Sequence, residues 1–252
     1  MASGNPVFAP AVTGDIFSDW ASAERRGRVM TVQGTAIKAL ILLVILTTTA
    51  VISWGQAGNP AISGGLLIGG LIGGLIAAMV TIFKRDWAPV TAPIYAACEG
   101  LVLGAISNLF ERQYPGIAVQ AVGVTFATMF AMLFIYMTGM IRVTDRLVRG
   151  VVAATGGICL FYFVAWILSF FGVVALNKII FGAGPIGIAF SVFVVGLAAF
   201  NLLLDFDFIE KGARAEAPKS LEWYGAFGLM VTLVWLYLEV LRLLSKLRSR
   251  ND

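Results

Sequence analysis

Residues 61–83 read AISGGLLIGGLIGGLIAAMVTIF, an unbroken stretch of 23 residues without a charged side chain. At a rise of 1.5 Å per residue, a helix of this length crosses the ~30 Å hydrocarbon core of a bilayer. The abundance of glycine, alanine and leucine favours such a helix over the alternating strands, each of about 10 residues, of a membrane barrel. The stretch therefore predicts an all-α membrane protein.

Six further apolar blocks extend this pattern along the chain, which is 59% hydrophobic and only 13% charged. A soluble domain is nearer 45–50% apolar and about 25% charged. The sequence thus predicts a polytopic seven-helix bundle over residues 37–247, with a polar N-terminal arm at 1–36 and a short basic tail at 248–252. The six further blocks are Ile37–Trp54, Ala88–Phe110, Ile117–Ile141, Val151–Phe171, Pro185–Phe208 and Leu221–Leu244.

The basic residues are distributed unevenly among the connections. If the seven blocks cross in turn, one side of the membrane carries 12 Lys and Arg residues and the other carries 2, before the last four are counted. Since Lys and Arg concentrate on the cytoplasmic side, the arm is predicted to be cytoplasmic. Their scattered placement argues against nucleic-acid binding. The last four, Arg242, Lys246, Arg248 and Arg250, suit the cytoplasmic side, so the last helix is either central or partly re-entrant.

Two sets of glycines predict close contacts between helices. Gly65, Gly69 and Gly73 follow one another at intervals of one helical turn, and Gly100 and Gly104 repeat this spacing in the next block. Small residues at this spacing let two membrane helices approach closely. A hinge or a pore lining is the functional alternative to this packing role.

Four acidic residues lie inside the apolar blocks, where each costs about 2.5–3.5 kcal/mol to insert. Such groups persist where they face a cavity or a partner. Glu99 falls near mid-depth, and Asp205 shares a helical face with Asn201, whereas Asp207 points to another face and marks the membrane exit. Glu239 has Arg242 three residues later, so a local ion pair is the alternative to a transport role.

The chain contains no histidine. It therefore lacks the commonest general base, metal ligand and near-neutral pH switch, and any proton chemistry falls on carboxylates. Neither a serine protease nor a zinc protease of the usual kind can be built from it. No Gly-x-Gly-Asp motif of an intramembrane aspartyl protease adjoins Asp205 or Glu239. We therefore predict a protein that is not an enzyme and needs no cofactor.

Three stretches carry a resemblance to a known family. They are residues 92–104 (APIYAACEGLVLG), 203–210 (LLDFDFIE) and 236–244 (LYLEVLRLL). Together they resemble the Bax inhibitor-1 family, also called the transmembrane Bax inhibitor motif family, in a bacterial form. The resemblance covers about Thr31 to Leu247 and implies a multi-pass protein of the bacterial cell (inner) membrane.

In that family two aspartates on the last two helices form a proton-sharing pair that gates a cation leak. The matching positions here are Asp205 and Glu239, the second with one methylene more. Some relatives add an arginine at the end of the second helix that pairs with the first aspartate, and Lys84 and Arg85 occupy that place. The resemblance thus implies a gate of Asp205 and Glu239, with Lys84 and Arg85 as modulating basic residues. From their positions in the apolar blocks we add Asn201 and Glu99 to the ion pathway and Arg242 to the modulating basic residues.

Two carboxyls close together in a low-dielectric site cannot easily both ionise, so such a pair holds a proton or recruits a cation. We therefore expect a pH-sensitive leak or exchanger for small cations, with protons as competitors and Ca²⁺ as the ion that takes oxygen ligands. Asp205 and Glu239 are the candidate Ca²⁺ contacts. A membrane stress-response or interaction protein without transport is the alternative.

The depth of the last helix limits this expectation. If the helix enters the membrane at Leu221, Glu239 lies about 27 Å further along it and cannot meet Asp205 near the other end. The pair therefore requires that residues 217–227 lie at the interface, or that the helix is re-entrant.

Overall fold

The computed structural model describes residues 29–56, 58–171 and 182–251. Within these ranges seven helices are long and apolar enough to cross a membrane, which confirms the predicted all-α, seven-span bundle. A short 3₁₀ turn, η2 (Arg85–Trp87), precedes α4. The seven helices are α2 (Val32–Gly55), α3 (Pro60–Phe83), α4 (Ala88–Gln113), α5 (Ile117–Met137), α6 (Asp145–Phe170), α8 (Pro185–Arg214) and α9 (Leu221–Asn251).

The predicted polar arm lies outside the described residues as far as residue 28. Its last five residues, 32–36, already belong to α2. The helix begins there because the Thr31 hydroxyl accepts a hydrogen bond from the Gly34 amide at 2.9 Å, as an N-cap does. The first transmembrane helix therefore begins before the apolar block that predicted it.

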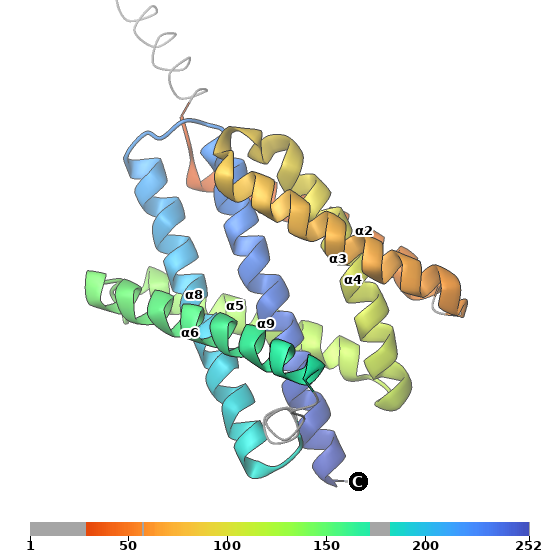
Figure 1. The fold of residues 1–252 in the computed structure, drawn as a ribbon. Helices are drawn as coiled ribbons and strands as arrows, with labels where there is room; N and C mark the ends of the chain where they lie inside the picture. Colours follow the sequence, from red (N-terminus) through yellow and green to blue (C-terminus); the bar gives the residue numbers. More distant parts are fainter. Residues whose placement is uncertain (1–28, 57, 172–181, 252) are drawn as a thin grey trace, which may run out of the picture.

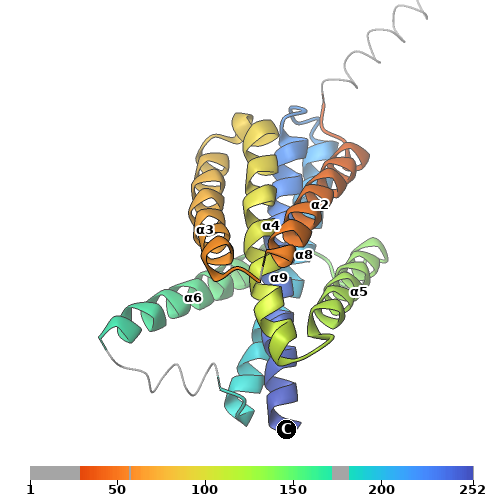
Figure 2. The same ribbon diagram turned by 90° about the vertical axis from the view of Figure 1, so that its right-hand side faces the viewer.

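Helix α9 lies at the centre of the bundle. It packs along α8 and also contacts α2, α4 and α5. Figure 1 shows α8 and α9 side by side, with α5 and α6 crossing them steeply, and Figure 2 shows these two crossing helices on opposite sides of the α8–α9 pair. The last helix is thus the element around which the other helices are arranged.

Of the two alternatives for the last helix, the structure supports the central one and not the re-entrant one. Helix α9 runs unbroken for 31 residues, or about 46 Å. No glycine or proline follows Gly228 to break it. Its C-terminus lies at the end of the bundle opposite the α8–α9 connection (Figure 1). There Arg248 donates to the Pro115 carbonyl at 2.7 Å, so the basic tail does not return to the side where α9 begins.

The glycines of α3 and α4 hold helices together, although not all those predicted do so. A Cβ at Gly104 would collide with the Ala50 backbone of α2, and Gly100 is equally close to that helix. This confirms the packing role of both residues. In α3, Gly73 lies against α4 as predicted, whereas an added Cβ at Gly65 or Gly69 would have nothing within 4 Å. Gly70 and Gly74 complete the contact with α4, so the spacing identified only one of its three glycines.

Gly104→Ala tests the approach of α2 to α4. The added methyl group meets backbone atoms that cannot rotate away, so we expect a loss of about 1–3 kcal/mol in the free energy of unfolding. Unfolding in mixed detergent micelles, followed by circular dichroism, measures this loss. Gly123→Ala on α5 is the matched control, because nothing lies within 4 Å of its added methyl group. Equal stability of the two variants would contradict this account of the packing.

Candidate functional site

A first group of polar side chains lies where α6, α8 and α9 meet. Asp205 of α8 faces α9, where Thr232 interacts with its carboxylate. An added Cβ at Gly228 would lie 3.7 Å from Asp205 Oδ1, so the absence of a side chain there leaves room for the acid. One turn earlier on α8, Asn201 donates to the Thr155 hydroxyl of α6 at 2.9 Å. We call Asp205, Asn201, Thr155 and Thr232 the Asp205 cluster.

A second polar group surrounds Glu239, which is 2% exposed. Its Oε1 accepts hydrogen bonds from Arg242 Nη1 at 2.7 Å and from the Tyr162 hydroxyl of α6 at 3.1 Å. One turn beyond Arg242, the buried Lys246 donates to the Ser191 hydroxyl of α8 at 2.8 Å and to a backbone carbonyl of the same helix. We call Glu239, Tyr162, Arg242, Lys246 and Ser191 the Glu239 cluster.

Each cluster contains a buried carboxylate oxygen without a hydrogen-bond partner among the described residues. These atoms are Asp205 Oδ2 and Glu239 Oε2. A charged oxygen buried in this way is costly unless a proton or a cation neutralises it. Both acids therefore offer one free ligand atom inside the bundle.

Apolar side chains separate the two clusters. On α8, Leu197 lies between Asn201 and Ser191, and on α9, Trp235 lies between Thr232 and Glu239. Leu197 packs with Ile158 of α6 in a buried apolar group against which Trp235 rests. The polar side chains therefore do not form a continuous path in this conformation.

The structure does not bring Asp205 and Glu239 together as the sequence predicted. Thr232, which faces Asp205, precedes Glu239 by seven residues, or about 10 Å along α9. Because α9 is continuous, neither a re-entrant turn nor a kink shortens this distance. Glu239 instead makes the local ion pair with Arg242 that the spacing allowed. The two acids are separate sites on one helix–helix interface.

Glu99 also lies apart from both clusters. Its carboxylate interacts with the Tyr95 hydroxyl and sits beside Gly74 of α3, where an added Cβ would be 3.2 Å from Oε1. The neighbouring helix is α3 and not the helix that the adjacent Gly100 approaches, which is α2, so Glu99 belongs to the α3–α4 contact.

The predicted modulating pair lies near the start of α9. Lys84 Nζ is 4.6 Å from the centre of the Trp87 ring, and the Arg85 guanidinium is 5.3 Å from the centre of the Tyr224 ring. Both arrangements are cation–π contacts. Neither side chain is placed on Asp205, so the expectation that they pair with it directly is not met.

Comparison with known proteins identifies the family to which the chain belongs. Residues 5–249 match the family described as Bax inhibitor 1 like. The chain belongs to this family. No curated protein and no solved structure matched it. The match confirms the resemblance read from residues 92–104, 203–210 and 236–244, and it makes the chain an integral, multi-pass membrane protein.

In this Bax inhibitor 1-like chain, no three Cys, Asp or Glu side chains of the described residues come together as a metal-binding group. A cation at Asp205 would therefore meet one carboxylate and neutral oxygens such as hydroxyls and carbonyls, whereas a cation at Glu239 would also face the Arg242 guanidinium. Tight Ca²⁺ sites use six to eight oxygens, more than either cluster offers.

The sequence did not predict a buried ion pair that ties α2 to α9 in this family member. Glu222 is 1% exposed and forms an ion pair with Lys38 of α2. Its other oxygen accepts from the Thr31 amide at 3.0 Å and from the Thr31 hydroxyl at 2.9 Å. The signal available was Lys38 itself, a cation in the first apolar block that needs a partner. Its partner is 184 residues away.

Lys38→Met tests the importance of this ion pair. The change leaves the Glu222 carboxylate buried without its counter-ion, so we expect a loss of about 3–5 kcal/mol in the free energy of unfolding. Lys211→Met is the control, because Lys211 is 64% exposed in its pair with Asp207 and should change stability by less than about 1 kcal/mol. The double variant Lys38→Met, Glu222→Gln should recover much of the loss. Equal losses of unfolding free energy in the two single variants would show that the buried pair contributes no more to stability than the exposed pair.

Proposed function

We propose that the protein leaks or exchanges small cations across its membrane along the interface of α6, α8 and α9, with Ca²⁺ as the first candidate ion. The observation that carries this proposal is the pair of unpartnered carboxylate oxygens, Asp205 Oδ2 and Glu239 Oε2, on one buried interface. Ionisable side chains inside a membrane typically mark ion pathways or proton relays.

Competition between protons and cations follows from this arrangement. An unpartnered carboxylate in a poorly hydrated interior is stabilised either by a proton or by a metal cation. Asp205 with Asn201 forms one binding position, and Glu239 forms a second whose charge is balanced in part by Arg242. Because the two positions are apart, each carboxyl exchanges its proton for a cation separately. The pH dependence therefore does not require a shared proton.

The apolar side chains between the clusters are proposed to act as the closed gate. A dry apolar constriction excludes ions until it hydrates. Leu197 of α8 and Trp235 of α9 come from the two helices that carry the acids. A small sliding or separation of α8 from α9 would hydrate the segment between Asp205 and Glu239. Arg85 would influence this motion only through Tyr224 at the start of α9.

A second candidate function is a membrane stress-response or interaction protein that moves no ions. Two observations favour it: Glu239 already has a counter-ion in Arg242, and apolar packing closes the space between the clusters. In that case the buried acids serve only to fix the packing of α8 on α9.

We also propose that the end of the bundle where α2 begins faces the cytoplasm of a bacterial cell. The connections at that end carry most of the Lys and Arg residues, which supports this orientation. The basic end of α9, with Arg248 and Arg250, then lies on the other side.

Flux of Ca²⁺ into proteoliposomes distinguishes the two functions. Uptake should be larger at pH 8 than at pH 6, because protons compete with the cation for the carboxylates. Asp205→Asn and Glu239→Gln each remove a charged ligand worth about 1.5–3 kcal/mol. Each should therefore lower the flux about ten- to hundredfold. Asp207→Asn, which changes a surface pair with Lys211, is the matched control. The absence of Ca²⁺ flux, or a flux that is the same in both variants as in the unchanged protein, would favour the non-transporting alternative.

Leu197→Ser tests the apolar gate with the same assay. A hydroxyl among the apolar side chains between the clusters lowers the cost of hydrating this segment, so we expect a several-fold increase in flux. Leu160→Ser on α6 is the control, since Leu160 is 63% exposed and should leave the flux unchanged. An unchanged or lower flux in Leu197→Ser, with the protein still folded, would show that Leu197 is not part of the gate.

A further inference from the structure

A continuous apolar groove runs between α2 and α5, with α9 as its floor. One part of it, about 540 Å³, lies between α2, α4, α5 and α9, and the other, about 720 Å³, lies between α2, α5, α8 and α9. Both volumes are of the size that holds a ligand. The two parts share four lining residues, so they are one groove: Leu43, Phe126, Met230 and Leu233.

The length of the groove matches the thickness of a membrane. Its lining begins at Val32 and ends at Trp54, the two ends of α2, which are about 33 Å apart along that helix. The hydrocarbon core is about 30 Å thick. The two parts meet at Leu43, the midpoint of α2. With α2 spanning the bilayer, each part would face the chains of one leaflet.

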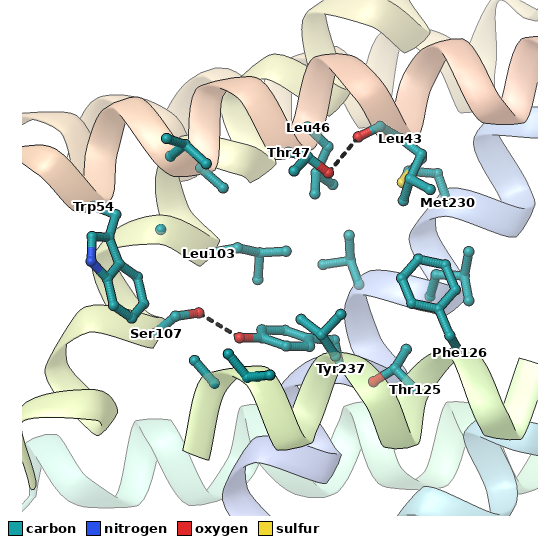
Figure 3. Close-up of a pocket in the computed structure, with 18 residues that line it drawn as sticks. Leu43, Leu46, Thr47, Trp54, Leu103, Ser107, Thr125, Phe126, Met230 and Tyr237 are labelled. Carbon is teal, nitrogen blue, oxygen red and sulfur yellow. Dashed lines mark hydrogen bonds between the residues drawn. The ribbon is translucent and has the colours of Figure 1, made fainter. Parts of the chain in front are cut away.

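The lining offers almost no hydrogen-bonding groups to a ligand in the part shown in Figure 3. The Thr47 hydroxyl donates to the Leu43 carbonyl at 2.8 Å, and the Thr125 hydroxyl donates to the Ala121 carbonyl at 2.7 Å. The Ser107 and Tyr237 hydroxyls bond to each other at 2.6 Å. Since both threonine donors and one of the two hydroxyl protons of the Ser107–Tyr237 pair are already used, a polar ligand would lose most of its bonds to water without replacement. The lining suits a saturated or unsaturated hydrocarbon chain.

The groove opens onto the lipid-facing surface and reaches the core. Val51 of α2 and Val119 of α5 line it and are 66% and 78% exposed, as residues in contact with lipid are. Met230 of α9 lines it at 2% exposure. An unfilled apolar groove of this depth forfeits the dispersion contacts of its walls. The bilayer is the adjacent source of chains that can enter sideways.

The two ends of the groove suit the headgroup regions. Trp54 lies at one end, and tryptophan is enriched at the membrane–water interface. At the other end the Tyr136 hydroxyl donates to Glu210, which also pairs with Arg214 at 2.5 Å. We propose that the groove binds two phospholipid acyl chains, one from each leaflet, whose ends meet at Leu43. This proposal does not depend on cation transport.

Native mass spectrometry of the full chain tests the proposal. The protein is reconstituted in vesicles of palmitoyl-oleoyl phosphatidylcholine, extracted in a mild detergent and washed. We expect two phosphatidylcholine molecules to remain on each chain. Retention of none, or of a free fatty acid only, overturns the proposal.

Variants that fill one half of the groove refine the test. Thr47→Trp fills the part near Trp54, and Ala36→Trp fills the part near Val32, so each should lower the retained lipid from two molecules to one. The controls are Thr48→Trp and Ile37→Trp, at adjacent exposed positions that do not line the groove, and both should retain two. The four variants are first checked for helical content and monodisperse elution. Should Thr47→Trp fail to fold, the Ala36 and Ile37 pair decides alone. Equal lipid numbers in a filling variant and its folded control overturn the proposal.

Discussion

The packing of α8 along α9 is the contact on which the rest of the structure depends. Backbone groups in a membrane helix are satisfied within the helix, so helices associate through side-chain contacts and through close approach at small residues. Here the interface contains two acids, and α6 is tied to it by Tyr162, which donates to Glu239, and by Thr155, which accepts from Asn201 beside Asp205. The burial of these acids thus determines the position of a third helix as well as the interface itself.

Much of the fold could be predicted from the sequence because the bilayer imposes a simple rule. An apolar block of about 20 residues must form a spanning helix, and all seven blocks do so. The end of α9 was harder, because its basic residues suggested a return to the starting side. They are accommodated by contacts that composition does not show, such as Arg248 with the Pro115 carbonyl.

The site was predicted less completely, for a physical reason. Their position inside apolar blocks identified Asp205 and Glu239 as candidate buried acids, and each has a buried carboxylate oxygen at the expected interface. Which groups face each other depends on the register of two antiparallel helices, and a sequence does not give this register. The same holds for Glu222 and Lys38, whose ion pair joins distant parts of the chain. Glu99 also has a glycine of another helix beside it, but this is Gly74 of α3 and not the adjacent Gly100, which approaches α2.

The two faces of α9 have a further consequence for how the lipid environment acts on the molecule. Thr232 and Glu239 lie toward α8 or α6, while Met230 and Leu233 form the floor between α2 and α5. A sideways displacement of α9 by the surrounding lipid would therefore also move the face that carries Thr232 and Glu239, without the binding of a ligand or a proton. Membrane thickness, chain unsaturation or lateral tension would then tune the protein mechanically, in addition to any response to acidity.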